Sequence, residues 1–435
     1  MLSYFKIRNF KSILDVTVDF SYAEGKAPNN YEQLNTIPFL EVDKKNRFVP
    51  CMAFYGANAS GKSNIIEALY VLKLIIKKGI NRKYRPNKLN NKYNCSLFEI
   101  EFFKDKTKYL YSIEYNKETI LKEFLFKNNK TLYSIDKNSK NDFTNIQTEI
   151  FNEKYLNNFI DVKCSEFNKE EKRMQTKTFL SATKAELSGL TIEINNVFEY
   201  ISSLIKVNLK NDLPYQIAID DLSDGNDNDA LQISFDKISK ILTKFDIDIE
   251  RMSINRETCQ SNELKNVVQK NMGIPVGIRE DKEKKILEID FINSYHKDIN
   301  NKEVMFNFRE ESNGTQILLS LIGFVLHALE KGSVLVIDEI DRAIHPMILI
   351  QIIKMFKDKD YNKKNAQLIF TCHATDILSE EVFRISEVSF ISKNLKDGST
   401  TKRISDFKDK DIRNVTDFRK LYWNGVFGGI PYPYI

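Results

Sequence analysis

The sequence predicts an α/β fold in which the two ends of the chain build one sheet, with an N-terminal β-subdomain and an inserted, mainly helical subdomain. Strand patterns followed by helical periodicity occur near both ends of the 435-residue chain, whereas apolar residues between about 140 and 245 recur at helical spacing. Only 15 glycines and 9 prolines are present, which indicates long elements with little linker. We therefore expect lobe I at 1–135, a helical insertion at 136–250 and lobe II at 251–435.

The first lobe is expected to begin with strands and to continue into a strand, a turn and a helix. Residues 2–20 alternate between apolar and polar side chains, as a strand pair does. Residues 49–55 have the pattern of a buried strand, and the apolar residues of 63–78 recur at helical spacing. Three runs within 97–135 are separated by turn-forming residues and predict antiparallel strands.

The rest of the chain is predicted to pass from helices back to strands. Apolar stripes at 197–205 and 231–245 predict helices in the insertion. The acidic run 220–229 lacks the terminal glutamate of an EF-hand, so we expect an ordinary loop there. Beyond it we expect strands near 250–256, 285–308, 334–337, 367–370 and 388–391, and helices at 315–331 and 347–357.

Composition excludes several classes of protein. The chain has 65 basic and 60 acidic residues, a net charge of +5, which is too mild to indicate a concentrated nucleic-acid-binding face. Five widely spaced cysteines and only four histidines argue against a zinc site and are typical of a reduced, cytoplasmic protein. The N-terminus lacks the apolar region of a signal peptide, and the most apolar run, 317–329, is too short to cross a bilayer. We expect no membrane partner.

The strongest motif is Gly-Ala-Asn-Ala-Ser-Gly-Lys-Ser at 56–63, a full match to GxxxxGK[ST]. Glycines such as Gly61 allow successive N–H groups to point at phosphate oxygens, and the helix that follows adds its dipole. Lys62 is expected to reach the β- and γ-phosphates, and Ser63 to offer its hydroxyl to magnesium. The motif follows an apolar strand and opens a helix, which is the context that such a loop requires.

A second motif, residues 334–339, consists of four apolar strand residues followed by two acids. A magnesium nucleotide needs a carboxylate at a strand end, and Asp338 fits that role. Hydrolysis needs a group that orients or deprotonates the attacking water, and Glu339 is placed one residue further on to do so.

Two further features lie in the second lobe. His373 comes just after a buried strand, at the edge where ligands bind to open parallel sheets, but a lone histidine there is also a common structural hydrogen-bonding group. The run 311–315 precedes an apolar helix. Either Ser312 or Thr315 is expected to cap that helix, or Ser312 and Gly314 form another anion site. A second anion site is needed only if nucleotide sites are shared between chains.

Taken in order, these features resemble the ABC-type ATPases of the SMC/Rad50/RecF/OLD group. Within that group the chain looks most similar to the compact AAA-like ATPases of bacterial abortive-infection and other phage-defence operons. The segments that carry the resemblance are 5–12, 56–63, 312–315, 334–339, His373 and the closing run 421–431.

The resemblance implies an ABC-type P-loop ATPase head that uses ATP and Mg²⁺. Asn58 is usual in the phosphate loop of this group. Ser312 and Gly314 would be the signature motif that contacts the γ-phosphate held by the other protomer. Asp341 would be the acid that crosses that interface, and His373 the switch histidine. The active unit would then be a head-to-tail homodimer, or a larger homo-oligomer, that sandwiches ATP.

The function that the resemblance implies is an ATPase whose nucleotide-dependent assembly senses phage infection and controls a separate effector, such as a nuclease or toxin. The short segment after His373 cannot hold the nuclease domain that OLD-type proteins carry in the same chain. The alternative is a RecF- or Rad50-like ATPase that binds DNA directly in repair or recombination. Direct DNA binding would show a steep dependence on salt, whereas an effector complex would persist while Mg-ATP is present.

Overall fold

The structure is a computed structural model. It describes residues 1–23, 36–136, 146–148, 178–180, 192–208, 228–264, 266–267, 277–281, 286–342, 344–407 and 417–430.

The chain divides into two compact units, each assembled from segments that are distant in sequence. Unit 1 comprises Met1–Lys206, Gly332–Asp338 and Met355–Ile435. Unit 2 comprises Val207–Lys331 and Glu339–Lys354. The boundary between Asp338 and Glu339 therefore falls between the two acids that the sequence singles out.

Four parallel strands form the centre of unit 1. They are β18 (Val388–Asn394), β5 (Cys51–Tyr55), β17 (Gln367–Thr371) and β16 (Val334–Asp338), in that spatial order. The strands β5, β16 and β17 are buried along nearly their whole length, which explains why the sequence shows continuous apolar runs there rather than alternation. Because the strands are parallel, their carboxyl ends meet at one edge of the sheet.

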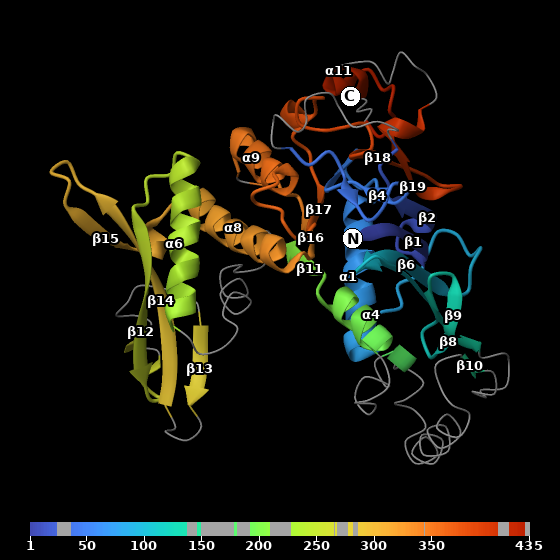
Figure 1. Ribbon diagram of the computed structural model, residues 1–435, viewed down its shortest axis with the longest axis horizontal. Coiled ribbons are helices and arrows are strands. Elements are labelled where there is room, and N and C mark those ends of the chain that lie inside the picture. Colours follow the sequence, from blue (N-terminus) through green and yellow to red (C-terminus); the bar gives the residue numbers. More distant parts are fainter. Residues whose placement is uncertain are drawn as a thin grey trace. The chain divides into compact units, whose positions relative to one another are not determined.

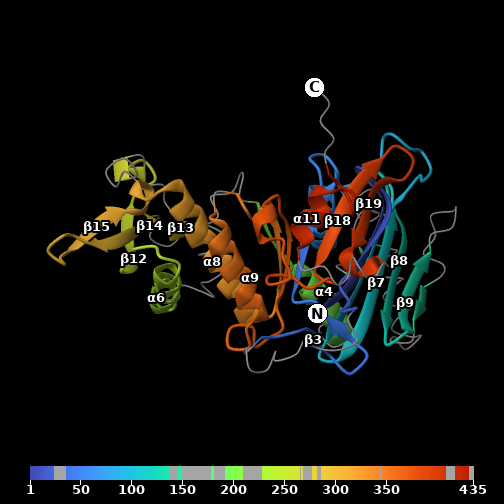
Figure 2. The same ribbon diagram turned by 90° about the horizontal axis from the view of Figure 1, so that it is seen from above.

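Antiparallel strands extend this sheet beyond β18, and β11 adds a strand beside β16. Among the described residues the sheet contains 13 strands in the order β10-β9-β8-β7-β6-β1-β2-β19-β18-β5-β17-β16-β11. In Figure 2, β8 and β9 lie near one end of this order, and β19 lies between them and β18. The pattern of buried and half-exposed residues alternates along β6, as one face of an antiparallel sheet requires. The added strands are β1 (Leu2–Phe10), β2 (Ile13–Asp19), β6 (Ser96–Lys104), β7 (Thr107–Tyr115), β8 (Ile120–Lys127), β9 (Lys130–Asp136), β10 (Ile146–Thr148), β11 (Ile205–Asn208) and β19 (Gly398–Arg403).

Helix α1 (Lys62–Lys78) packs on this sheet and anchors the phosphate loop to it (Figure 1). It contacts β1, β16, β17 and α4 (Ile192–Ser202). The apolar residues on which the prediction rested, Ile65, Ile66, Leu69, Leu72, Ile75 and Ile76, are buried, which confirms the predicted helix. Shorter elements of unit 1 are β3 (Leu40–Glu41), β4 (Arg47–Phe48), η3 (Thr375–Ile377), η4 (Ile404–Asp406) and α11 (Phe418–Trp423).

Unit 2 combines a second antiparallel sheet with helices. Strand β14 pairs with β12, β13 and β15, and α6 packs beside β12 (Figure 1). Helix α9 begins in unit 2 and ends in unit 1. The elements are α6 (Asn228–Lys244), β12 (Arg251–Cys259), β13 (Gly277–Asp281), β14 (Ile286–Lys297), β15 (Glu303–Asn307), η2 (Phe308–Glu310), α8 (Asn313–Lys331) and α9 (Pro346–Lys357).

The predicted α/β fold with a large sheet is confirmed, with one correction in the insertion. The apolar stripe 197–205 is not one helix, because α4 ends at Ser202 and Ile205 opens the strand β11. The described part of 136–250 holds helices and the short strands β10 and β11, so a mainly helical insertion stays a prediction. Most of the run 220–229 lies outside the described residues. Within the described part of the chain, no helix has the length and apolarity needed to cross a membrane.

Candidate functional site: a phosphate loop at the parallel sheet edge

The predicted phosphate loop connects β5 to α1. Its geometry depends on glycine at Gly61, where φ is +109°, because a Cβ there would overlap Ser399 Oγ and lie 2.7 Å from Ser12 Oγ. Gly61 also provides no side chain to cap α1. The first N–H groups of a helix lack intrahelical acceptors, and together with the helix dipole they favour an anion. The loop therefore fits a phosphate group.

The ammonium of Lys62 lies within the loop. Its Nζ donates hydrogen bonds to the carbonyl oxygens of Gly56, at 2.7 Å, and Ala57, at 3.0 Å. The side chain of Lys62 is buried, whereas Asn58 and Ala59 are exposed at the tip of the loop. A cation is thus held by two backbone carbonyls of the loop, and phosphate oxygens can replace these carbonyls as its partners.

Three polar side chains form a hydrogen-bonded chain that supports the phosphate loop. Ser399 Oγ donates to the carbonyl oxygen of Ser60 at 2.7 Å and shares a hydrogen bond of 2.7 Å with Ser12 Oγ. Asn64 Nδ2 donates to Ser12 Oγ at 2.7 Å. Ser12 belongs to the N-terminal motif that carries the family resemblance, but its spacing predicted no role, and no local pattern pointed to Asn64 or Ser399.

Asp338 accepts hydrogen bonds from two hydroxyl groups at the carboxyl edge of the sheet. Ser63 Oγ donates to Asp338 Oδ1 at 2.9 Å, and Thr371 Oγ1 donates to the same oxygen at 2.7 Å. The three residues come from α1, β16 and β17, which the parallel topology brings to one edge. The role of Thr371 was not predicted from the sequence. Its position as the last residue of the buried strand before His373 is the feature that could have indicated this role.

The oxygen atoms of Ser63 and Asp338 suit a magnesium ion that also binds a nucleotide. Mg²⁺ prefers hard oxygen ligands, and it usually takes only one or two protein oxygens and completes its shell with phosphates and water. In the described residues, no group of three or more His, Cys, Asp or Glu side chains could hold a metal ion alone. The donor set therefore fits Mg²⁺ bound together with phosphate and does not form a protein-only cage.

His373 follows β17 in unit 1, and Glu339 follows β16 in unit 2. His373 is exposed, and the next residue is fixed because Tyr55 Oη donates to the carbonyl oxygen of Ala374 at 3.1 Å. Glu339 has a φ of +54°, a left-handed conformation that is uncommon for a residue with a side chain. Both Glu339 and Asp341 are half-buried. Glu339 and Asp341 belong to unit 2, whereas His373 belongs to unit 1.

In unit 2, Ser312 caps helix α8. Its Oγ accepts a hydrogen bond from Thr315 N at 3.1 Å and lies 2.8 Å from Thr315 Oγ1. Ser312 is exposed, and Gly314 is half-buried in the first turn of the helix. Of the two expectations for this run, the capping interaction is the one recorded in the structure. An exposed cap of this kind still leaves N–H groups of the first turn available to an anion from outside.

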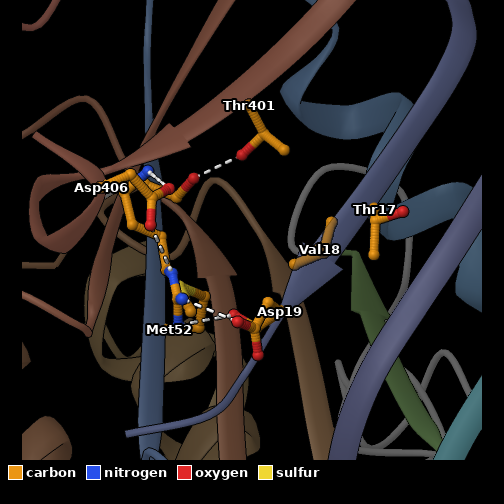
Figure 3. Close-up of a pocket in the computed structure, with 8 residues that line it drawn as sticks. Thr17, Val18, Asp19, Met52, Thr401 and Asp406 are labelled. Atoms are coloured by element: carbon orange, nitrogen blue, oxygen red, sulfur yellow. Dashed lines mark hydrogen bonds and ion pairs between the residues drawn. The ribbon is translucent and has the colours of Figure 1, made fainter. Parts of the chain in front are cut away.

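A small pocket of about 120 Å³ in unit 1 is lined by residues of β2, β5, β18, β19 and η4 (Figure 3). Arg403 on its wall pairs with Asp19 at 2.7 Å and with Asp406 at 3.6 Å, and it donates to the carbonyl oxygen of Ser21 at 2.8 Å. The guanidinium is therefore satisfied by the protein itself. Met52, which also lines the pocket, is near the start of β5, whereas the phosphate loop follows the end of that strand.

Comparison with known proteins identifies a matching protein family. Residues 51–379 match a protein family described as "AAA domain, putative AbiEii toxin, Type IV TA system". Among solved structures, the chain is similar to the SMC head domain from Thermotoga maritima, with 13% sequence identity, a TM-score of 0.41, and coverage of 92% of this chain and 98% of that one. No curated protein matches the chain.

The family match includes the phosphate loop, Asp338, Thr371 and His373, and it covers well over half of the sequence. The chain therefore belongs to this family of AAA-type P-loop ATPases linked to AbiEii toxin systems.

Proposed function

We propose that the chain binds and hydrolyses Mg-ATP and uses nucleotide-dependent dimer or oligomer formation to control a separate effector in antiviral defence. The observation that carries this proposal is the convergence of Ser63, Asp338 and Thr371 at the end of the phosphate loop. A hydroxyl and a carboxylate in hydrogen-bond contact, next to a lysine held inside a phosphate loop, are the groups that a magnesium nucleotide requires.

ATP binding would use the residues of the loop in separate roles. The N–H groups at the start of α1 would hold the phosphates, with Asn58 at the loop tip beside them. Lys62 would exchange the carbonyls of Gly56 and Ala57 for phosphate oxygens. Ser63 and Asp338 would hold Mg²⁺, which when bound supplies positive charge that offsets the charge of the phosphates. Thr371 would keep the Asp338 carboxylate in one orientation.

Hydrolysis would need a group that removes a proton from the attacking water. Glu339 follows the magnesium carboxylate by one residue, and its carboxylate would accept that proton. His373 lies two residues beyond Thr371, and its imidazole would donate a hydrogen bond to the γ-phosphate. The left-handed backbone at Glu339 supports a role for it, because such conformations concentrate at functional sites.

A homodimer would complete the site. The exposed N-terminus of α8, with Ser312 and Gly314, offers a second anion site in the same chain. One nucleotide needs one such loop, so the second is accounted for if it contacts the γ-phosphate held by a partner protomer. Asp341 would cross that interface. The result would be a head-to-tail assembly of two chains around two ATP molecules.

The proposed partner is a nuclease-like or toxin-like effector in the cytoplasm, which the ATPase would hold and then release when phage infection is sensed. This step is supported by the family description, which refers to a toxin and to a Type IV TA system. In the described residues no metal-binding acidic cluster offers nuclease chemistry of the chain's own.

The experiment is to purify the complex expressed from its native operon with Mg-ATP present throughout and to measure its mass and composition. A second protein in a fixed ratio, lost from the Lys62→Ala variant, would support the proposal. The outcome that contradicts it is a chain that emerges alone, dimerises with ATP and binds DNA in a salt-sensitive way. That result would instead support a DNA-repair ATPase.

A further inference from the structure

The closing segment, defined here as Phe418–Gly429, packs against the phosphate-loop side of unit 1. It begins with α11, whose N-cap Asp417 accepts a hydrogen bond from Lys420 N at 3.0 Å. In both views α11 lies beside β18, which is separated from it in sequence by β19 and η4 (Figures 1 and 2). No residue of this segment has a role in the ATP binding and hydrolysis proposed above.

Four buried aromatic rings fix the closing segment in place. Tyr422 stacks on Phe390 of β18, with ring centroids 5.1 Å apart and an interplanar angle of 21°. Phe427 stacks on the same Phe390 ring at 4.5 Å and 12°. Tyr422 also meets Tyr55 edge-on at 6.3 Å. Since Tyr55 is the residue before Gly56, the ring cluster holds the segment against the strand that leads into the phosphate loop.

The backbone of the segment makes a closer contact with the loop at Gly429. A Cβ added there would lie 2.8 Å from the carbonyl oxygen of Ile391 and 3.4 Å from Gly56 Cα. A Cβ on Gly56 would collide with the same Ile391 oxygen. Tyr422 Oη donates to the carbonyl oxygen of Gly429 at 3.2 Å and fixes the position of this glycine. The backbone of the closing segment therefore lies so near the first residue of the phosphate loop that a methyl group on Gly429 would touch Gly56.

The same segment reaches the loop that carries His373. Tyr55, which packs on Tyr422, donates to the carbonyl oxygen of Ala374. Arg419 of α11 pairs with Asp376 at 3.6 Å, three residues beyond His373. The closing segment thus contacts two loops at one edge of the sheet, and both contain residues of the proposed nucleotide site.

We propose that the closing segment is a positioning element of the nucleotide site, with Tyr422 and Gly429 as positioning residues that set the backbone of Gly56. The inference rests on the proposed ATP binding. If the segment fixes the entry to the phosphate loop, its loss weakens nucleotide binding, and bound nucleotide in turn stabilises the segment, because coupling between two sites is reciprocal. The expected kinetic signature is a KM for ATP that rises more than kcat falls.

Two neighbouring glycines provide a matched pair of variants. Gly428 and Gly429 have φ values of +69° and +68°, so alanine strains the backbone equally at both. A Cβ at Gly428 meets nothing within 4 Å, whereas one at Gly429 presses on Ile391 and approaches Gly56. We expect Gly429→Ala to raise the Kd for a fluorescent ATP analogue about tenfold and Gly428→Ala to change it less than about twofold. Equal Kd values for two folded variants overturn the proposal.

Two measurements keep the test decisive if Gly429→Ala does not fold. Tyr422→Phe retains the ring stack and removes only the hydroxyl that binds Gly429, and we expect it to raise the Kd about threefold. In the wild-type chain, Mg with a slowly hydrolysed ATP analogue should slow hydrogen exchange in 418–429, and Lys62→Ala should abolish that effect. Unchanged exchange and an unchanged Tyr422→Phe affinity overturn the inference.

The two proposals fail in distinguishable ways. If neither wild type nor Gly428→Ala binds the nucleotide, the proposed ATP binding is wrong. If both bind it and Gly429→Ala binds it equally well, only the role of the closing segment is wrong.

Discussion

The hydroxyl of Thr371 donates a hydrogen bond of 2.7 Å to Oδ1 of Asp338, the same oxygen that accepts from Ser63. Thr371 is fully buried at the end of β17, whereas Asp338 is half-buried at the end of β16. The neighbouring strand therefore fixes the orientation of the carboxylate from the protein side. Ser63 meets that carboxylate from the first turn of α1.

Thr371→Val tests this orienting hydrogen bond. Valine keeps the shape of the side chain and removes its donor, and a hydrogen bond to a charged group contributes about 1.5–3 kcal/mol. We expect the Mg²⁺ concentration for half-maximal ATP hydrolysis to rise about tenfold. Thr371→Ser keeps the hydroxyl and should behave like wild type. Equal Mg²⁺ dependence of the valine and serine variants would show that Asp338 needs no such support.

Lys62→Ala removes the ammonium that the loop carbonyls hold. Because this cation would otherwise neutralise phosphate charge inside a buried loop, we expect the affinity for a fluorescent ATP analogue to fall at least about tenfold. Lys78→Ala is the matched control, since it makes the same change at the exposed end of α1. Nucleotide titrations in which both variants bind like wild type would remove Lys62 from the site.

Glu339→Gln keeps the size of the side chain and removes the proton acceptor. General-base catalysis contributes about 10²–10⁴-fold in rate, so we expect ATP turnover to fall by at least about 100-fold while ATP still binds. The closed dimer should then accumulate, which light scattering after size-exclusion chromatography would detect. Glu330→Gln, at an exposed ion pair with Lys237, serves as control. Turnover at the native rate in Glu339→Gln would assign the base to another residue.

The buried carboxylate of Glu123 predicts a pH dependence of stability. Burial raises the pKa of Glu123 above its ordinary value of 4.5, although the Tyr111 and Tyr133 hydroxyls and the N–H groups of Phe179 and Leu180 donate to it. Folding therefore takes up a proton between the unfolded and folded pKa values. The contribution of this carboxyl to the free energy of unfolding is then largest below pH 4.5 and falls as the pH rises through the folded pKa.

The Glu123→Gln variant isolates this contribution. We expect the stability of wild type relative to the variant to decrease as the pH rises from about 4.5 and to level off above the folded pKa. Urea unfolding midpoints across that range measure the difference. The exposed Glu118→Gln variant provides the control. An advantage of wild type that grows with pH would mean that the four hydrogen bonds outweigh burial and lower the pKa.

Sequence patterns predicted the elements of the site because each of them is local. The phosphate loop requires residue types at fixed spacing between a strand and a helix, and the structure has β5 and α1 on either side of it. The apolar run before Asp338 likewise predicts a buried strand, which is β16. The prediction of one helix over 197–205 was wrong, because apolar side chains continue at similar spacing from the end of α4 into the strand β11.

The sequence by itself determined which residues form the phosphate loop and the strand ends, since these depend on spacing along a short stretch of backbone. Only the tertiary structure decided which side chains support them. Ser12 meets Ser399 across 387 positions of the chain, and Thr371 reaches Asp338 only because β17 pairs beside β16. Hydrogen bonds between distant segments leave no pattern of spacing in the sequence, because they form only where the order of strands in the sheet brings those segments together.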